Sequence, residues 1–113
     1  MPNAFNVSES SFQSTVIGLA KLYGWRVVHY RPCLNQRGKW LTPSTGDSGF
    51  PDLVLARPHL GDFVIAELKA PNGRLSDGQK VWLDTLLRAG VETYVWFPRD
   101  LPEIRKRLER KPA

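Results

Sequence analysis

Three charged residues in the middle of the chain occupy positions where a buried strand rarely carries charge. Glu67 and Lys69 end the apolar run 63–69, and Asp52 opens the apolar run 52–56 that precedes it. Residues two apart project from the same face of a strand, so Glu67 and Lys69 share a face. If the two runs pair as a hairpin, the start of the first lies beside the end of the second. Asp52 then meets both residues at one edge of a sheet.

This combination of groups suits one kind of chemistry. Two neighbouring carboxylates repel each other unless a cation lies between them. Carboxylate oxygens are the ligands that Mg²⁺ and Mn²⁺ prefer, and a nearby ammonium group can stabilise a hydroxide or a phosphate oxygen. Such a site suits metal-assisted hydrolysis of a phosphodiester. The alternative is an exposed ion pair between Glu67 and Lys69 on an edge strand, which requires no function.

The residues around these three extend the pattern. The run Gly49-Phe50-Pro51-Asp52-Leu53 is followed by Glu67-Leu68-Lys69, then by Gly73-Arg74-Leu75-Ser76, Gln79, Trp82 and Leu83. Pro51-Asp52 with Glu67-Leu68-Lys69 resembles the PD-(D/E)xK nuclease signature. The longer set resembles the VRR-NUC family of that superfamily, especially its small stand-alone members in phages and bacteria. The resemblance covers the chain from Glu9 to about Leu108.

The resemblance implies a role for each residue of the site. Asp52, Glu67 and the backbone carbonyl of Leu68 would hold Mg²⁺ or Mn²⁺, and Lys69 would position and activate the attacking water. The first helix would supply an acid that orients a water or helps to hold a second metal, and Glu9 matches it. The implied activity is that of a metal-dependent DNA endonuclease, selective for branched DNA such as Holliday junctions. Paired cuts in a symmetric junction would need two sites, and therefore a homodimer.

Two polar side chains fall on the apolar faces of predicted helices. Ser8 is a good N-cap for a first helix, and Glu9 falls near the middle of that helix's apolar face. Glu9 is therefore either a charge that stabilises the helix start or an acid turned inward over the sheet. Residues 76–79 (Ser-Asp-Gly-Gln) fit a capping box at the start of a second helix. Gln79 either closes that box or, as the family pattern implies, points at the site, and we expect that one side chain can hardly do both at once.

A long loop, residues 32–50, leads to Asp52. Its two prolines and three glycines oppose a long helix or strand. Loops of this length in a small domain are usually functional or disordered, and we expect this one to serve function. We predict DNA contacts from this loop, from the residue just before it and from the family-like motif, at Arg31, Arg37, Lys39, Trp40 and Arg74. Trp40 has packing as its alternative role.

Composition sets bounds on the kind of protein. The 113 residues suffice for one domain, with residues 1–7 a loose lead-in, and the net charge of +5 favours an anionic partner. Cys33 is the single cysteine, which excludes an internal disulfide and a cysteine-cluster zinc site. No signal peptide or membrane span is expected, so the predicted setting is the cytoplasm of a bacterial or phage-infected host cell.

The predicted fold is an α/β domain with element order α-β-β-β-α-β-α. A hairpin followed by a helical crossover into a fourth strand gives a four-stranded mixed sheet with helices on both faces, plus a C-terminal helix. This order matches the restriction-endonuclease-like αβββαβ core. In the last helix we predict a capping box from Asp100 to Glu103 and a solvated basic face that includes Arg107. His29, in the first strand, is expected to pack rather than act as a base, because no acid lies near it in the sequence.

Two other functions remain open at this stage. The chain could be a DNA-binding module that keeps the nuclease fold without cutting, although every expected site residue is present. It could also act on a small phosphate ester, although the chain has no Gly-rich phosphate loop and its charge is basic.

Overall fold

The computed structural model describes residues 8–30, 33–34, 40–41 and 45–111. In chain order its elements are α1 (Glu9–Leu22), β1 (Arg26–His29), β2 (Cys33–Leu34), β3 (Trp40–Leu41), β4 (Leu53–Ala56), β5 (Phe63–Leu68), α2 (Asp77–Arg88), β6 (Glu92–Trp96), a 3₁₀ turn (Pro98–Asp100) and α3 (Leu101–Glu109). This order confirms the predicted one. The addition is the short hairpin β2–β3, which lies within the loop that leads to Asp52.

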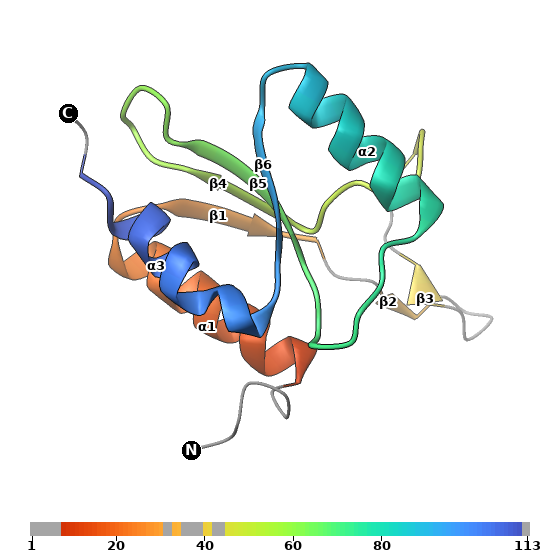
Figure 1. The fold of residues 1–113 in the computed structure, drawn as a ribbon, viewed down its shortest axis with the longest axis horizontal. Coiled ribbons are helices and arrows are strands. Elements are labelled where there is room, and N and C mark those ends of the chain that lie inside the picture. Colours follow the sequence, from red (N-terminus) through yellow and green to blue (C-terminus); the bar gives the residue numbers. More distant parts are fainter. Residues whose placement is uncertain (1–7, 31–32, 35–39, 42–44, 112–113) are drawn as a thin grey trace.

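Four strands form one mixed sheet in the order β1-β4-β5-β6. β1, β4 and β5 pair antiparallel, and β6 pairs parallel to β5 because α2 carries the chain back across the sheet. Figure 1 shows α1 and α3 side by side along one face, with α2 on the other side. The predicted α/β class and the mixed four-stranded sheet are therefore confirmed. None of the helices in the described ranges is long and apolar enough to span a membrane.

The core lies between the sheet and the pair α1 and α3. Its fully buried side chains are Phe12, Val16, Ala20, Leu53, Leu55, Val64, Ala66, Leu68, Ile104 and Leu108. The core thus takes every second residue of β5, which leaves Ile65 and Glu67 on the opposite face, toward α2. The strand is thus covered on both sides where the site lies, and its charges need buried partners.

The helix starts follow the predicted caps in two of three cases. The Ser8 hydroxyl accepts a hydrogen bond from the Ser11 N–H at 3.1 Å, and Ser76 forms the predicted capping box with Gln79. The box predicted for α3 is wrong. The Asp100 carboxylate instead accepts from the Phe97 N–H at 2.9 Å, inside the 3₁₀ turn that precedes α3. The turn brings the Phe97 N–H to the Asp100 carboxylate, so this side chain does not cap α3.

Four side chains form what we call the ionic cluster, at the end of the sheet where β5 begins: Arg57, Asp62, Glu92 and Arg107. Arg57 Nε lies 2.8 Å from Asp62 Oδ2, and Arg107 Nη2 lies 3.3 Å from Asp62 Oδ1 and 3.0 Å from Glu92 Oε1. Both guanidinium groups also lie over the Trp25 ring. The prediction that Arg107 faces solvent is wrong, because partners from distant segments bury it.

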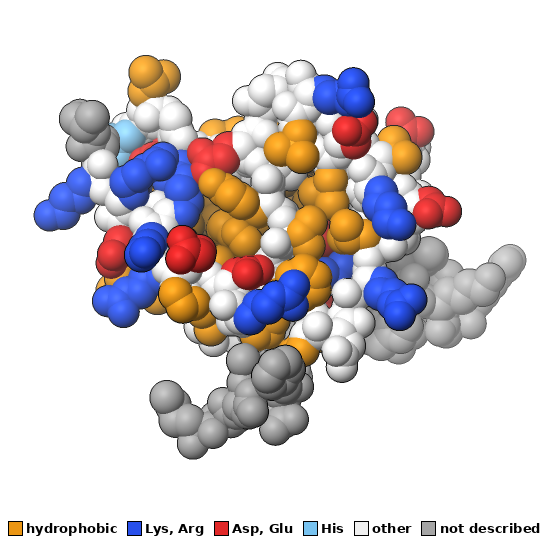
Figure 2. Space-filling model, viewed as in Figure 1, with side chains coloured by type: hydrophobic (Ala, Val, Ile, Leu, Met, Phe, Trp, Pro, Cys, Tyr) orange, Lys and Arg blue, Asp and Glu red, His pale blue; other side chains and the backbone are white. Residues whose placement is uncertain are grey.

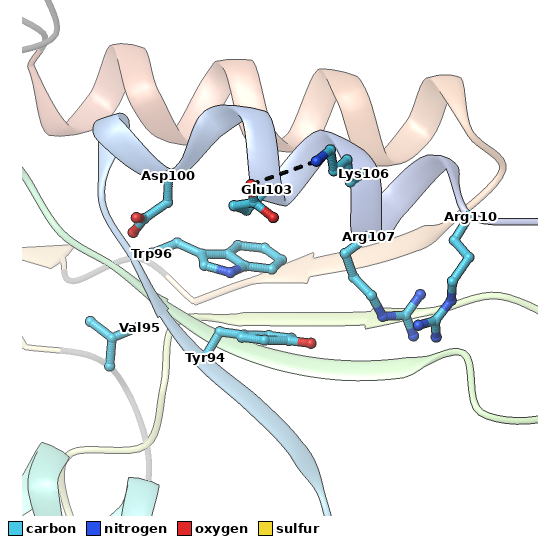
Figure 3. Close-up of a pocket in the computed structure, with 8 residues that line it drawn as sticks. All are labelled: Tyr94, Val95, Trp96, Asp100, Glu103, Lys106, Arg107 and Arg110. Carbon is cyan, nitrogen blue, oxygen red and sulfur yellow. Dashed lines mark ion pairs between the residues drawn. The ribbon is translucent and has the colours of Figure 1, made fainter.

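An open hollow lies between the edge strand β6 and helix α3 (Figure 3). Apolar side chains gather near the middle of the face that Figure 2 shows. The lining residues of the hollow are Tyr94, Val95, Trp96, Asp100, Glu103, Lys106, Arg107 and Arg110. Most of its charges already have partners within the fold: Lys106 lies 3.9 Å from Glu103 and Arg107 belongs to the ionic cluster. The hollow contains none of the predicted site residues.

Candidate active site

The pairing of β4 with β5 brings Asp52 to Glu67. Leu53 lies opposite Ala66, so one further step of the antiparallel register places Asp52 beside Glu67. The Asp52 carboxylate accepts a hydrogen bond from the Leu68 N–H at 3.1 Å, and its backbone carbonyl accepts from the Tyr30 N–H at 2.7 Å. Asp52 is thus held between β1 and β5, as the predicted hairpin requires.

Four residues form what we call the site network: Asp52, Glu67, Lys69 and Gln79. Lys69 Nζ lies 3.4 Å from Glu67 Oε2 and donates to Gln79 Oε1 at 3.0 Å, and Gln79 Nε2 donates to Glu67 Oε2 at 3.0 Å. Glu67 is only 4% exposed and lies on an interior strand. The alternative of an exposed ion pair on an edge strand is therefore wrong.

Gln79 does what we expected one side chain could hardly do. Its Oε1 atom accepts from the Ser76 N–H at 2.8 Å, which closes the capping box, and from Lys69 Nζ at the same time. Because both partners of Oε1 are donors, Nε2 is left to donate to Glu67. The expectation failed because an amide has two different ends, and a carbonyl oxygen has two lone pairs. The cap of α2 thereby fixes a residue of the site.

The two carboxylates of the site carry more negative charge than their surroundings offset. The pKa of Asp52 is raised to about 7, first by burial and then by the charge of Glu67. The pKa of Glu67 is also raised, chiefly by burial, although Lys69 opposes the shift. Carboxyl groups whose pKa is raised in this way are typical of functional sites and of sites that bind a cation.

A divalent cation fits this pair of carboxylates. Its charge would relieve the repulsion that raises the pKa of Asp52, and oxygen ligands suit Mg²⁺ and Mn²⁺. In the described ranges no three His, Cys, Asp or Glu side chains come close enough to hold a metal together. Asp52 and Glu67 would therefore be joined by other oxygens, such as the predicted carbonyl of Leu68 and waters, which Mg²⁺ usually retains.

Glu9 lies in the first turn of α1 and is exposed. Its place in the first turn agrees with a charge that stabilises the helix start, and its role as an acid of the site stays a prediction. Its charge nonetheless raises the pKa of both Asp52 and Glu67, so α1 places it on the side of the site. Glu9 acts on the site network through space rather than as a member of it.

A close backbone contact joins the loop before Asp52 to the start of α2. Gly49 has φ 98°, and a Cβ atom there would lie 2.4 Å from the backbone carbon of Gly78. The Trp82 indole N–H donates to the Asp47 carbonyl at 3.1 Å in the same region. Only glycine permits both this φ and this approach. The contact sets the distance between Asp52 and Gln79, which lie on either side of it.

The structure describes the side chain of one of the five residues predicted to contact DNA, and those contacts stay predictions. Arg31, Arg37 and Lys39 lie outside the described residues, as does the side chain of Trp40. Arg74 is exposed in the connection between β5 and α2. Its neighbour Gly73 packs against the Lys69 side chain, where a Cβ would lie 3.1 Å from Lys69 Cδ. Arg74 is therefore close along the chain to the residues of the site and open to a ligand.

One residue near the site is missed by sequence reasoning. His29 Nε2 lies 3.8 Å from Asp52 Oδ2, and the His29 side chain is 8% exposed. The acid near His29 is Asp52, directly before β4, and it comes close because β4 pairs with β1 so that His29 lies opposite Leu53. Period-2 alternation in a single strand carries no signal for such a contact, because the partner strand is 23 residues away along the chain.

Curated proteins match part of the chain. The Fanconi-associated nuclease 1 homolog of Schizosaccharomyces pombe is 42% identical over 48 residues, which is 42% of this chain and 7% of that protein. Fanconi-associated nuclease 1 of Homo sapiens is 43% identical over 47 residues, which is 42% of this chain and 5% of that protein. The chain thus corresponds to a small fraction of the length of these relatives. No solved structure matches the chain.

The strongest match is to a domain family, and it contains most of the site. Residues 32–96, more than half of the chain, match the VRR-NUC domain. This segment includes Asp52, Glu67, Lys69 and Gln79 and the hairpin that joins them, while α1 with Glu9 lies before it. With the expected mixed sheet around these residues, the match shows that the chain belongs to the VRR-NUC family.

Proposed function

We propose that this chain is a divalent-metal-dependent endonuclease that hydrolyses phosphodiester bonds in DNA. The observation that carries the proposal is the site network itself, in which the buried Glu67 and the half-buried Asp52 have raised pKa values beside a lysine, within the segment that matches the family. Similarity to proteins named Fanconi-associated nuclease 1 supports the reaction class. The net charge of +5 supports an anionic polymer as substrate.

Each residue of the network has a defined task in this proposal. Asp52 and Glu67 hold the cation, which would supply a Lewis acid for the scissile phosphate and lower the pKa of a water. Lys69 places an ammonium group where negative charge develops in the transition state. Gln79 keeps Lys69 and Glu67 in position, because its amide bonds to both. Gly73 leaves room for the Lys69 side chain, because a Cβ there would lie 3.1 Å from Lys69 Cδ.

The test is a cleavage assay with purified protein, Mg²⁺ or Mn²⁺, and linear duplex, flap, splayed-arm and four-way-junction DNA. The wild type should cut at least one of these, and EDTA should stop it. Asp52→Asn and Glu67→Gln should each remove cleavage and keep the fold, because each removes a charge that the metal needs. Asp84→Asn makes the same kind of change at an exposed carboxylate of α2 and should cut normally.

Lys69→Ala separates catalysis from metal binding. It should lose at least about 10²-fold in rate, comparable with the loss of one transition-state donor, and still bind Mg²⁺ in a calorimetric titration. Lys69→Arg should restore little, because a planar fork cannot take the place of a compact ammonium group. Full cleavage by any of these site variants would contradict the assignment. A wild type that binds all four DNAs and cuts none would favour the non-cleaving module.

The finer part of the proposal concerns the preferred DNA. Family resemblance supports branched substrates such as Holliday junctions, and paired cuts in a symmetric junction would need a homodimer. Junction resolution into two nicked duplexes, with light-scattering mass measured on the same sample, tests both points. A monomer that nicks one strand at a time would remove this part and leave the nuclease proposal intact.

A further inference from the structure

Three aromatic side chains form a chain of ring contacts beside the site network, which we call the aromatic cluster: Tyr30, Phe50 and Trp82. The ring centroids of Tyr30 and Phe50 lie 6.1 Å apart, and those of Phe50 and Trp82 lie 5.0 Å apart, both in edge-to-face geometry. Tyr30 is 45% exposed and Phe50 is 38% exposed. Large aromatic side chains usually bury such area in a core, so this open ring surface is unusual.

Each ring is tied to a residue of the site network. The Tyr30 N–H donates to the Asp52 carbonyl at 2.7 Å, and Phe50 precedes Asp52 by two residues. Trp82 follows Gln79 by three residues on α2, which places both side chains on neighbouring parts of one helix face. Trp82 is also held by its bond to the Asp47 carbonyl. The cluster therefore cannot move independently of the carboxylates.

The arrangement leaves ring faces available to a ligand. In an edge-to-face pair, the edge of one ring meets the face of the other, so the contacts do not cover both faces of both rings. Trp82 is the more buried member and fixes Phe50 against α2. Tyr30 and Phe50 present their remaining surface on the same side as the site network. A flat apolar surface next to a phosphate-cleaving site matches a nucleobase, which lies within one nucleotide of the phosphates that flank it.

We propose that Tyr30 and Phe50 form a stacking surface for one unpaired nucleobase adjacent to the phosphate that is cleaved. The inference rests on the proposed nuclease function and deepens it. Bases inside a duplex already stack on both neighbours, so only an unpaired or displaced base can use such a surface. The site is thereby adapted to DNA that offers an unpaired nucleotide at the cut, as single strands, flaps and junctions do.

Binding without cleavage tests the stacking directly. The probe is a single-stranded oligonucleotide that carries one 2-aminopurine, a base whose fluorescence falls when it stacks, mixed with protein in EDTA. Wild-type protein should quench the probe. Tyr30→Leu and Phe50→Leu keep an apolar side chain but remove the ring, and each should reduce quenching and weaken binding roughly tenfold, the usual scale for one stacked base. Tyr30→Phe keeps the ring and should behave as the wild type.

Phe63→Leu is the matched control. Phe63 is an aromatic side chain that is 48% exposed, at the opposite end of β5 from Glu67. Its replacement should change neither quenching nor affinity, and thermal melts of all variants show that the fold is kept. If Tyr30→Leu and Phe50→Leu bind and quench like the wild type, the stacking proposal is overturned. Quenching lost equally in Phe63→Leu would also overturn it, because the apolar surface would then act without regard to position.

Cleavage assays separate this inference from the nuclease proposal. The Leu variants should cut flap and single-stranded DNA roughly tenfold more slowly than the wild type and lose less on linear duplex. A wild type that cuts DNA, with Leu variants that match it on every substrate, removes the stacking surface and leaves the nuclease. A wild type that quenches the probe but never cuts keeps the surface and removes the nuclease. Equal losses on all substrates contradict selection of an unpaired base.

Discussion

The two ends of β5 carry two clusters of buried charge that have opposite electrostatic character. At its start, the ionic cluster binds each carboxylate to a guanidinium group, and the pKa values of Asp62 and Glu92 are lowered although burial would raise them. At its end, the site network has too little positive charge to neutralise its two carboxylates, and the pKa values of Asp52 and Glu67 are raised. About five residues of strand, roughly 17 Å, separate the two.

The difference shows which burial of charge serves the fold and which serves a ligand. The ionic cluster contains two arginines and two carboxylates, so its charges balance without any added ion. The site network contains one lysine for two carboxylates, and the nearby Glu9 adds negative charge. A fold does not gain from that excess, whereas a cation-binding site requires it.

The largest effect on stability should come from breaking the ionic cluster. Arg107→Leu leaves the buried Asp62 with Arg57 as its remaining partner and removes the guanidinium group from the partly exposed Glu92, which should cost about 3 kcal/mol of unfolding free energy, the lower end for a broken buried pair. Chemical denaturation measures it. Lys106→Leu, at the exposed neighbouring position, should change stability by less than about 0.5 kcal/mol. Cleavage per folded Arg107→Leu molecule should equal that of the wild type, and a specific loss of rate would show that the two clusters are coupled.

Removing a charge from the site network should stabilise the protein instead of destabilising it. A carboxyl group whose pKa is raised on folding supports stability at low pH and loses that support as the pH rises through its folded pKa, here about 7. In EDTA above pH 7, Asp52→Asn should therefore stabilise the protein, by on the order of a few kcal/mol since one pKa unit is worth about 1.4 kcal/mol. At pH 4 the gain should disappear.

Addition of Mg²⁺ sharpens the same comparison. It should raise the melting temperature of the wild type at pH 8, because the cation binds only the folded state. Asp52→Asn should gain little from the ion. A wild type that is equally stable from pH 5 to pH 8 in EDTA would contradict the excess of negative charge at the site.

A smaller effect is expected from Gln79→Glu, which keeps an oxygen for Ser76 and Lys69 but removes the donor that faces Glu67. The rate should fall roughly 10–100-fold, or about 1.4–2.7 kcal/mol in the barrier, because a third carboxylate repels Glu67. The melting temperature should fall above pH 7, because the added charge lies beside Glu67, although the capping box survives. Gln79→Met, which lacks both ends of the amide, should lose rate and cap together.

The smallest effect should follow from Glu9→Gln. The carboxylate acts on Asp52 and Glu67 only through space and is exposed to solvent. Its removal should lower the pKa of both groups slightly and change the rate no more than severalfold, with about 0.3–1 kcal/mol lost at the helix start. Salt should abolish the pKa effect, because exposed charges are screened. A hundredfold loss of rate would instead show that Glu9 contacts a ligand that the site takes up.

Local sequence signals were enough to predict the sheet, two of the helix caps and the juxtaposition of Asp52 with Glu67 and Lys69. These features depend on period-2 alternation, cap residues and the geometry of a hairpin, all of which are properties of neighbouring residues. The burial of Arg107 and the contact of His29 with Asp52 were not predicted, because the partner residues come from distant segments of the chain. Charge patterning on a helix reports only that helix, and it cannot show that Asp62 and Glu92 converge on Arg107.

The contact of Gly49 with Gly78 divides the connection between β1 and β4 into parts that differ in their tolerance to added residues. Between Gly49 and Leu53 the spacing is fixed, because one inserted residue would shift Asp52 out of register with Glu67. Residues inserted before Asp47 should not displace the carboxylates, because the contact of Gly49 with α2 and the hydrogen bond from Trp82 to Asp47 fix the chain after the insertion. Exchange of the segment between Tyr30 and Asp47 should therefore leave the spacing of Asp52, Glu67 and Gln79 unchanged.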